Sequence, residues 1–200
     1  MRAVVEAAAR VFDREGMEAT TNRIAEEAGV SIGSLYQYFP NKEALLMALA
    51  ERHLEDGEAA LQAAATAVRD AASMVDVVRG LVGAAAAAHR EHPRMHEVLE
   101  LVASRTPEVL ARARGLKVML EQELARHLRR LRPELDQPER KAALAATVIG
   151  GAMHELVVGA EPDPAQVDEI VALCTVYLDA DGAQEQGRSS PAAVESEGNS

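Results

Sequence analysis

Between residues 21 and 42, small, hydroxyl-bearing and amide side chains of the kinds that touch DNA are concentrated. Hydroxyls, a lysine ammonium and free backbone amides at helix starts can donate hydrogen bonds to phosphates, which positions a protein on a duplex. Small residues in the first turn of a helix let its backbone approach base edges in a major groove about 12 Å wide. We therefore predict ten DNA-contacting residues: Thr21, Asn22, Ser31, Ile32, Gly33, Ser34, Tyr36, Gln37, Tyr38 and Lys42.

Two short helices joined by a tight turn would position these side chains. A helix is predicted to begin at Thr20 or Thr21, and Gly29 follows it where a left-handed residue is needed. Ser31 can cap a second helix, which Pro40 ends. The pattern predicts a helix-turn-helix, with a third helix opening immediately afterwards.

The second of these helices has two distinct faces. Leu35 and Phe39 fall on its inward face, whereas Tyr36 and Tyr38 lie outward with the other polar residues. The alternative for the two tyrosines is ordinary packing in the core. We predict Phe39 to be a core residue and the tyrosines to face DNA.

Residues 2–50 resemble the DNA-binding domain of the tetracycline-repressor (TetR) family of bacterial transcription regulators. The resemblance implies an all-α fold, a dimer bound to double-stranded operator DNA, and a helical domain that holds a small effector. It is carried by Ala8, Phe12, Gly16, Thr20-Thr21, Ile24-Ala25, Gly29-Val30-Ser31, Gly33-Ser34-Leu35-Tyr36, Tyr38-Phe39, Lys42-Glu43 and Leu45-Leu46.

The charge of the chain argues against strong electrostatic binding to DNA. The formal net charge is −11, and residues 1–50 hold five basic and seven acidic side chains. Phosphate neutralisation by Lys and Arg supplies much of the affinity of proteins for DNA. We therefore expect modest non-specific affinity, a few well-placed donors, and contacts doubled through a dimer.

The rest of the chain is predicted to be helical. Ala, Leu and Val dominate an apolar content of 48%, and strand patterns are nearly absent. We predict an all-α protein with a helix-turn-helix DNA-binding domain at 1–50, a helical ligand-binding and dimerisation domain at 51–178, and a disordered tail at 179–200. A long helix from about residue 41 to 68 would link the first two.

The last two predicted helices are rich in apolar residues on several faces. Two such neighbours at the end of an all-helical chain suggest a four-helix bundle formed with a second copy, as the resemblance also implies. The alternative is burial within one monomer. The predicted dimer-interface residues are Leu144, Val148, Ile149, Ala152, Met153, Leu156, Val167, Ile170, Val171, Cys174 and Tyr177.

The middle of the chain suggests a flexible aliphatic pocket for an apolar effector. Four methionines lie there among many Leu, Val and Ala residues, while Tyr177 is the one aromatic after Phe39. The alternative is that these residues are merely core. The predicted pocket residues are Val78, Leu81, Val82, Met95, Leu99, Val102, Met119 and Met153.

No pattern in the sequence predicts catalysis, a metal or a cofactor. His89, His92 and His96 have a helical spacing, but Pro93 interrupts it and no carboxylate cluster completes a ligand set. No long apolar run predicts a membrane span, and the single cysteine fits a reducing compartment, so we expect a cytoplasmic protein without catalytic residues. Two alternatives to a DNA-binding regulator remain: a helical ligand-binding or scaffold protein that has lost DNA binding, and an enzyme.

Overall fold

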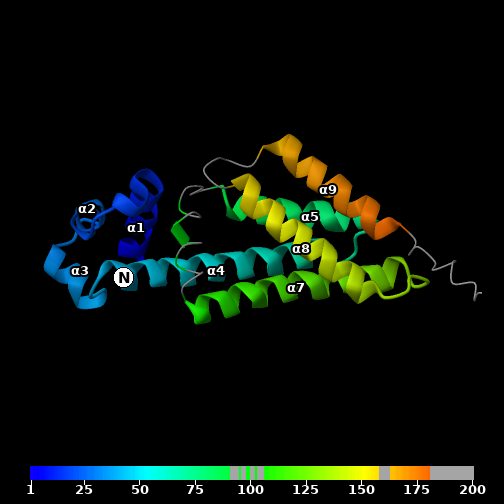
Figure 1. The fold of residues 1–200 in the computed structure, drawn as a ribbon, viewed down its shortest axis with the longest axis horizontal. Helices are drawn as coiled ribbons and strands as arrows, with labels where there is room; N and C mark the ends of the chain where they lie inside the picture. Colours follow the sequence, from blue (N-terminus) through cyan, green and yellow to red (C-terminus); the bar gives the residue numbers. More distant parts are fainter. Residues whose placement is uncertain (91–94, 96–97, 100–101, 103–105, 158–162, 181–200) are drawn as a thin grey trace, which may run out of the picture.

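The computed structural model is helical throughout the residues that it describes, which are 1–90, 95, 98–99, 102, 106–157 and 163–180, without the side chains of 154, 156 and 157. Three short helices form a head at one end, and the long α4 runs from it into a bundle of four further helices (Figure 1). The elements are α1 (Arg2–Glu15), a 3-10 turn (Gly16–Glu18), α2 (Thr21–Glu27), α3 (Ile32–Tyr38), α4 (Lys42–Ala67), α5 (Met74–Ala88), α7 (Pro107–Leu131), α8 (Pro138–Val157) and α9 (Pro164–Asp179).

Side-chain caps define where several of these helices begin. The Thr20 hydroxyl accepts the backbone N–H of Arg23 at 3.3 Å, and Asn41 caps α4 by accepting from Ala44 at 2.8 Å. Thr106 precedes α7, with Pro107 in the first turn, but its hydroxyl makes no cap bond. It points to α4 instead, where it lies 3.5 Å from the sulfur of Met47.

The apolar interior consists of two clusters along α4. The first joins α1, α2 and α3 to the first half of α4, and it also contains residues 95, 98, 99 and 109. The second lies between the end of α4 and helices α5, α7, α8 and α9. Because α4 contributes to both clusters and crosses residue 50 without a break, the head and the body share one rigid connector.

Helices α4 and α5 approach each other closely at a glycine. A Cβ atom on Gly80 would lie 2.4 Å from Cγ1 of Val68, a distance that real side chains do not adopt. Gly83, three residues further along α5, has nothing within 4 Å of the same position. The absence of a side chain at Gly80 therefore sets the packing distance between the end of α4 and α5.

A buried histidine on α7 organises polar contacts inside the body. His127 is fully buried, with Nε2 3.1 Å from a Glu123 carboxylate oxygen and Nδ1 3.0 Å from Nη2 of Arg130. Arg130 also donates to the carbonyl of Ala71, in the connection between α4 and α5, at 2.6 Å. Burial, together with the positive charge of Arg126, lowers the pKa of His127 below its usual 6.5.

Candidate nucleic-acid interface

The turn between α2 and α3 has the geometry that the sequence predicts. Gly29 adopts a φ of 68°, in the left-handed region that favours glycine. The N–H of Val30 then returns to the carbonyl of Ala25 at 3.0 Å, and the Ser31 hydroxyl accepts the N–H of Ser34 at 3.0 Å. These local bonds fix α3 against α2 and leave the first turn of α3 at the surface.

Helix α3 presents the predicted polar face outward. Leu35 and Phe39 are buried in the first apolar cluster. Tyr36 and Tyr38 are 46% and 60% exposed, so neither tyrosine is a core residue. Ile32, Gly33 and Gln37 are exposed as well, while Ser34 is half-buried. This face can enter a groove without any rearrangement of the core.

Thr21 and Tyr36 join the two helices across this surface. The Thr21 hydroxyl lies 3.0 Å from the Tyr36 hydroxyl. Asn22, the next residue on α2, is exposed beside them. The contact orients the Tyr36 ring and places two hydroxyl groups together at the edge of the predicted interface, where a phosphate can accept the one hydroxyl hydrogen that the contact leaves free.

Lys42 is already engaged within the head. Its ammonium donates to the carbonyl of Met17 in the 3-10 turn and lies 5.6 Å from the centre of the Phe12 ring. The sequence predicted only a phosphate contact for this residue. Since an ammonium has three N–H donors, two remain for a phosphate, and the internal bond holds the side chain in place at the start of α4.

Three of the five basic residues of the head are paired with glutamates. Arg10 and Arg14 contact the carboxylate of Glu27 at 3.0 and 2.8 Å, and Arg14 followed by Arg10 lowers the pKa of Glu27. Arg23 lies 3.5 Å from each of two further glutamates, at positions 15 and 26. The DNA-facing surface therefore has even less free positive charge than the sequence count suggests.

The residues of the predicted effector pocket are divided between the two apolar clusters. Val78, Leu81, Val82 and Met153 are packed in the second apolar cluster, whereas Met95, Leu99 and Val102 belong to the first, around the head. Met119 is half-buried on α7 and belongs to neither. Sequence periodicity identified these residues as apolar and inward, but it could not tell which of two cores each helix faces.

The predicted dimer-interface residues divide between the core and the surface. Five of them, Ile149, Met153, Ile170, Val171 and Cys174, are buried inside the monomer, where they pack in the second apolar cluster. The interface itself stays a prediction. The side chain of Leu156 lies outside the described residues, and Val148, Ala152, Val167 and Tyr177 are half-buried. Leu144 is 50% exposed.

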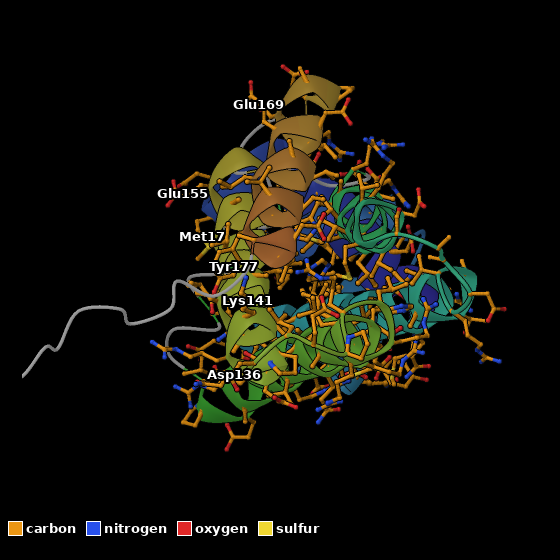
Figure 2. All side chains as sticks on the ribbon, turned by 90° about the vertical axis from the view of Figure 1, so that its right-hand side faces the viewer. Met17, Asp136, Lys141, Glu155, Glu169 and Tyr177 are labelled. Carbon is orange, nitrogen blue, oxygen red and sulfur yellow. The ribbon has the colours of Figure 1, made fainter. Side chains whose placement is uncertain are left out.

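The outer face of α9 exposes apolar residues that are not among the predicted interface residues. Figure 2 views the end of the body where α8 and α9 lie beside each other, with Glu155 and Glu169 towards one end. Leu173 and Val176 on α9 are 61% and 71% exposed. Residues 169, 173 and 176 are spaced i, i+4 and i+7, so they lie on one stripe of α9, here called the outer stripe. The charged Glu169 on this stripe is the sequence signal that it faces away from the core.

The outer stripe is supported by contacts between α8 and the C-terminus of α9. The Lys141 ammonium donates to the carbonyl of Tyr177 at 2.9 Å and lies 5.0 Å from the centre of its ring (Figure 2). Arg132, directly after α7, donates to the carbonyl of Asp179 at 2.6 Å and ties the same end of α9 to the body. Cations at the C-terminus of a helix satisfy its free carbonyl groups and its dipole, so the two helices form one surface.

The described part of the chain has neither a metal-binding cluster nor a helix that could span a membrane. Within the described residues, no group of three His, Cys, Asp or Glu side chains is arranged to hold a metal ion. His92 and His96 of the predicted histidine series lie outside those residues. None of the helices described here is long and apolar enough to cross a membrane.

Comparison with known proteins identifies both parts of the chain. Residues 4–49 match the family of bacterial regulatory proteins named tetR, and residues 73–178 match the tetracyclin repressor-like C-terminal domain. The chain is 40% identical over 55 residues to YfiR of Bacillus subtilis, an uncharacterized HTH-type transcriptional regulator, and the match covers 27% of either chain. It thus spans about a quarter of the length of that relative.

Solved structures share the arrangement of helices over most of the chain. PfmR from Thermus thermophilus, a TetR family transcriptional regulator, is 24% identical with a TM-score of 0.63, over 88% of this chain and 96% of its own. AibR, solved with isovaleryl coenzyme A and operator DNA, is 22% identical with a TM-score of 0.65, over 87% and 97%. At these identities the likeness concerns the arrangement of helices.

Proposed function

Because the chain belongs to the TetR family of DNA-binding transcription regulators, a family of regulators rather than enzymes, we propose that it is a dimeric repressor released from its operator by a small molecule. The operator is a near-palindrome of two half-sites, each bound by one head. Its half-sites lie about 34–36 Å apart, or a multiple of that distance.

The observation that carries this proposal is the exposed face of α3 beside the start of α2. Asn22, Ser34 and Gln37 supply the amides and the hydroxyl that can bond base edges, and Ile32 is available to thymine methyl groups. Hydroxyl groups at Thr21 and Tyr36, with the ammonium of Lys42, hold the phosphates on either side. Tyr38, which is 60% exposed, supplies a further hydroxyl group for a phosphate.

Dimerisation through α8 and α9 follows from their outer surface. Large apolar side chains stand out on two adjacent helices there, with Leu173 and Val176 the most exposed. A second copy related by a two-fold axis would cover the exposed faces of α8 and α9 at once and complete a four-helix bundle. Two linked heads bind a palindrome far more tightly than one, which offsets the weak charge of each.

A ligand response is supported by the way the body connects to the head. Residues 95, 98 and 99 follow α5 and pack in the core of the head, and the N–H of Met95 donates to Asp13 on α1 at 3.3 Å. A molecule that shifts the helices around this contact favours one spacing of the two heads over another. AibR has been solved with an acyl coenzyme A thioester as well as operator DNA, which makes an effector with an apolar acyl part a reasonable expectation.

Fluorescence anisotropy with DNA selected from a genomic pool tests the interface. We expect Gln37→Ala and Tyr38→Ala each to weaken binding to a selected site by about 10-fold or more, since lost base and phosphate contacts cost about 1–3 kcal/mol. Gln62→Ala, an exposed glutamine on α4 far from α3 in the chain, is the matched control and should bind as the wild type does. Absence of any salt-dependent DNA binding would instead support a helical ligand-binding or scaffold protein.

A further inference from the structure

Helix α3 carries no charged side chain along its whole length. Together with α2 it forms the end of the molecule that points away from the body, and its outward face is exposed (Figure 1). In the major groove, guanine is most commonly read by a bidentate Arg or Lys, and adenine by a bidentate Asn or Gln. Helix α3 therefore lacks the side chains that usually read guanine.

The five basic residues of the head lie on other elements, Arg2, Arg10 and Arg14 on α1, Arg23 on α2 and Lys42 at the start of α4. Four of them are bonded inside the head. Arg10 and Arg14 contact Glu27, and Arg23 lies near two further glutamates. The Lys42 ammonium donates to a carbonyl in the 3-10 turn. An arginine would have to leave its glutamate to read a base beside α3, which opposes guanine recognition there.

Gln37 provides the free amide of the α3 face. Its side chain is exposed, and the described residues include no hydrogen-bond partner for it. A primary amide has N–H donors and a carbonyl acceptor, which match N7 and the N6 amino group of adenine at the same time. Guanine presents two acceptors, N7 and O6, so the amide oxygen would face another oxygen. Adenine is therefore the base that satisfies both ends of the amide.

The backbone beside Gln37 can approach a base edge because Gly33 lies one turn before it. A Cβ atom at Gly33 would meet only the Ser31 hydroxyl within 4 Å, at the ordinary contact distance of 3.8 Å. The fold itself therefore does not require glycine at this position. Its lack of a side chain leaves open surface next to the amide, where a base pair can lie.

Ile32 provides an exposed aliphatic side chain in the first turn of the same helix. The C5-methyl group of thymine is the apolar group that a base pair presents in the major groove, so contact with Ile32 favours thymine. Ser34 is less available, since it is half-buried and its hydroxyl lies 2.8 Å from that of Ser31. The base contacts of α3 therefore fall to Gln37 and Ile32, and both side chains favour A·T pairs.

We propose that the base pairs under α3 in each operator half-site are A·T pairs. Gln37 forms two hydrogen bonds, with N7 and the N6 amino group of an adenine, and Ile32 packs against the methyl group of a thymine. Asn22, an exposed amide on α2, has the same preference for adenine. This base preference rests on the proposed function, because it requires the outward face of α3 to enter the major groove.

Selection of binding sites from a random DNA pool tests the proposal with the full chain. The wild type, Gln37→Ala and Ile32→Ala are selected in parallel, and the position at which a variant loses its base preference is the one that its side chain reads. We expect an A·T pair at both positions. A G·C pair at either would overturn the proposal, and so would unchanged preferences in both variants. Gln62→Ala on α4 is the control and should select the same sites as the wild type.

Two modified bases test single atoms in the selected operator. In one half-site, 7-deazaadenine lacks N7 and should weaken wild-type binding about 3- to 10-fold, the usual effect of one hydrogen bond. Deoxyuridine lacks the thymine methyl group and should weaken it about 3- to 5-fold. Gln37→Ala should not respond to the first change, nor Ile32→Ala to the second. Equal losses in the wild type and the matching variant would overturn the contacts, as would a 7-deazaadenine scan of the half-site without any effect on the wild type.

The outcomes separate the A·T preference from the proposed function. Salt-dependent, site-specific binding with G·C pairs under α3 would leave a DNA-binding regulator and refute the A·T preference. Absence of any salt-dependent binding would refute both. Gln37→Arg should change the preferred pair at its position from A·T to G·C, because a guanidinium matches N7 and O6 of guanine. A variant that still selects A·T there would show that residue 37 does not read this pair.

Discussion

The salt dependence of operator binding provides a quantitative test of how the acidic head contacts DNA. The perturbation is potassium chloride raised from 50 to 200 mM, applied to the wild type and to two charge variants, Lys42→Gln and Arg23→Gln. Each phosphate neutralised by a cation contributes about −0.9 to the slope of log K against log salt. The slope therefore gives the number of protein cations that neutralise phosphates at the interface.

The structure sets an upper value for that count. Arg10, Arg14 and Arg23 are paired with glutamates, which leaves Lys42 and Arg2, for which the described residues include no ion pair. Two cations in each head give at most four in a dimer, hence a slope of about −3.6 and a loss of about 150-fold over the fourfold change in salt. Losing both Lys42 side chains should reduce the slope to about −1.8, and Arg23→Gln should leave it near −3.6.

The assay is anisotropy of a labelled operator at five or more salt concentrations. A wild-type slope steeper than about −6 would refute the reasoning, because it would require the paired arginines to leave their glutamates and neutralise phosphates. A shallower slope in Arg23→Gln, equal to that of Lys42→Gln, would refute it for Arg23 in particular. In either case the ion pairs seen in the free head would not persist on DNA.

Three further outcomes follow from the packing of the body. Gly80→Ala should lower the free energy of unfolding by about 1–3 kcal/mol in urea titrations, while Gly83→Ala should raise it by up to about 1 kcal/mol; equal values for the two would contradict the close contact. Leu173→Glu should raise the dimer dissociation constant by about 100-fold in analytical ultracentrifugation without loss of helix content, because a carboxylate buried without a partner costs about 3 kcal/mol; an unchanged dimer would place the interface elsewhere. Because the pKa of His127 is lowered, the unfolded chain takes up this proton first, so stability should fall as pH drops below 6.5, and His127→Gln should flatten that fall; the effect of Glu123, whose pKa is also lowered, begins only below its usual 4.5.

Local sequence signals determined where the helices begin and how the recognition unit is built. The caps at Thr20, Ser31 and Asn41 depend on side chains that accept a bond from the backbone N–H three residues later, and Thr20 and Ser31 stand where the sequence predicts helix starts. Gly29 adopts the left-handed φ that the turn requires. Such interactions involve few neighbouring residues, so the sequence specifies them without knowledge of the rest of the fold.

These local signals were enough to identify the family from residues 2–50. Composition and periodicity were enough to predict the all-α class. The outward face of α3 also followed from its spacing, since Leu35 and Phe39 had to face the core. The exposed tyrosines, Tyr36 and Tyr38, are consistent with that spacing. Their role on DNA stays a prediction.

Only the tertiary structure decided which apolar residues are core and which are surface in the body. Helices α8 and α9 are apolar on several faces, so periodicity could not separate buried Ile170 from exposed Leu173. The partner of each face is another helix far away in the sequence. The pairing of Arg10 and Arg14 with Glu27 and the bond from Lys42 to the carbonyl of Met17 have the same origin: each joins groups from separate elements of the head, and no local pattern encodes that contact.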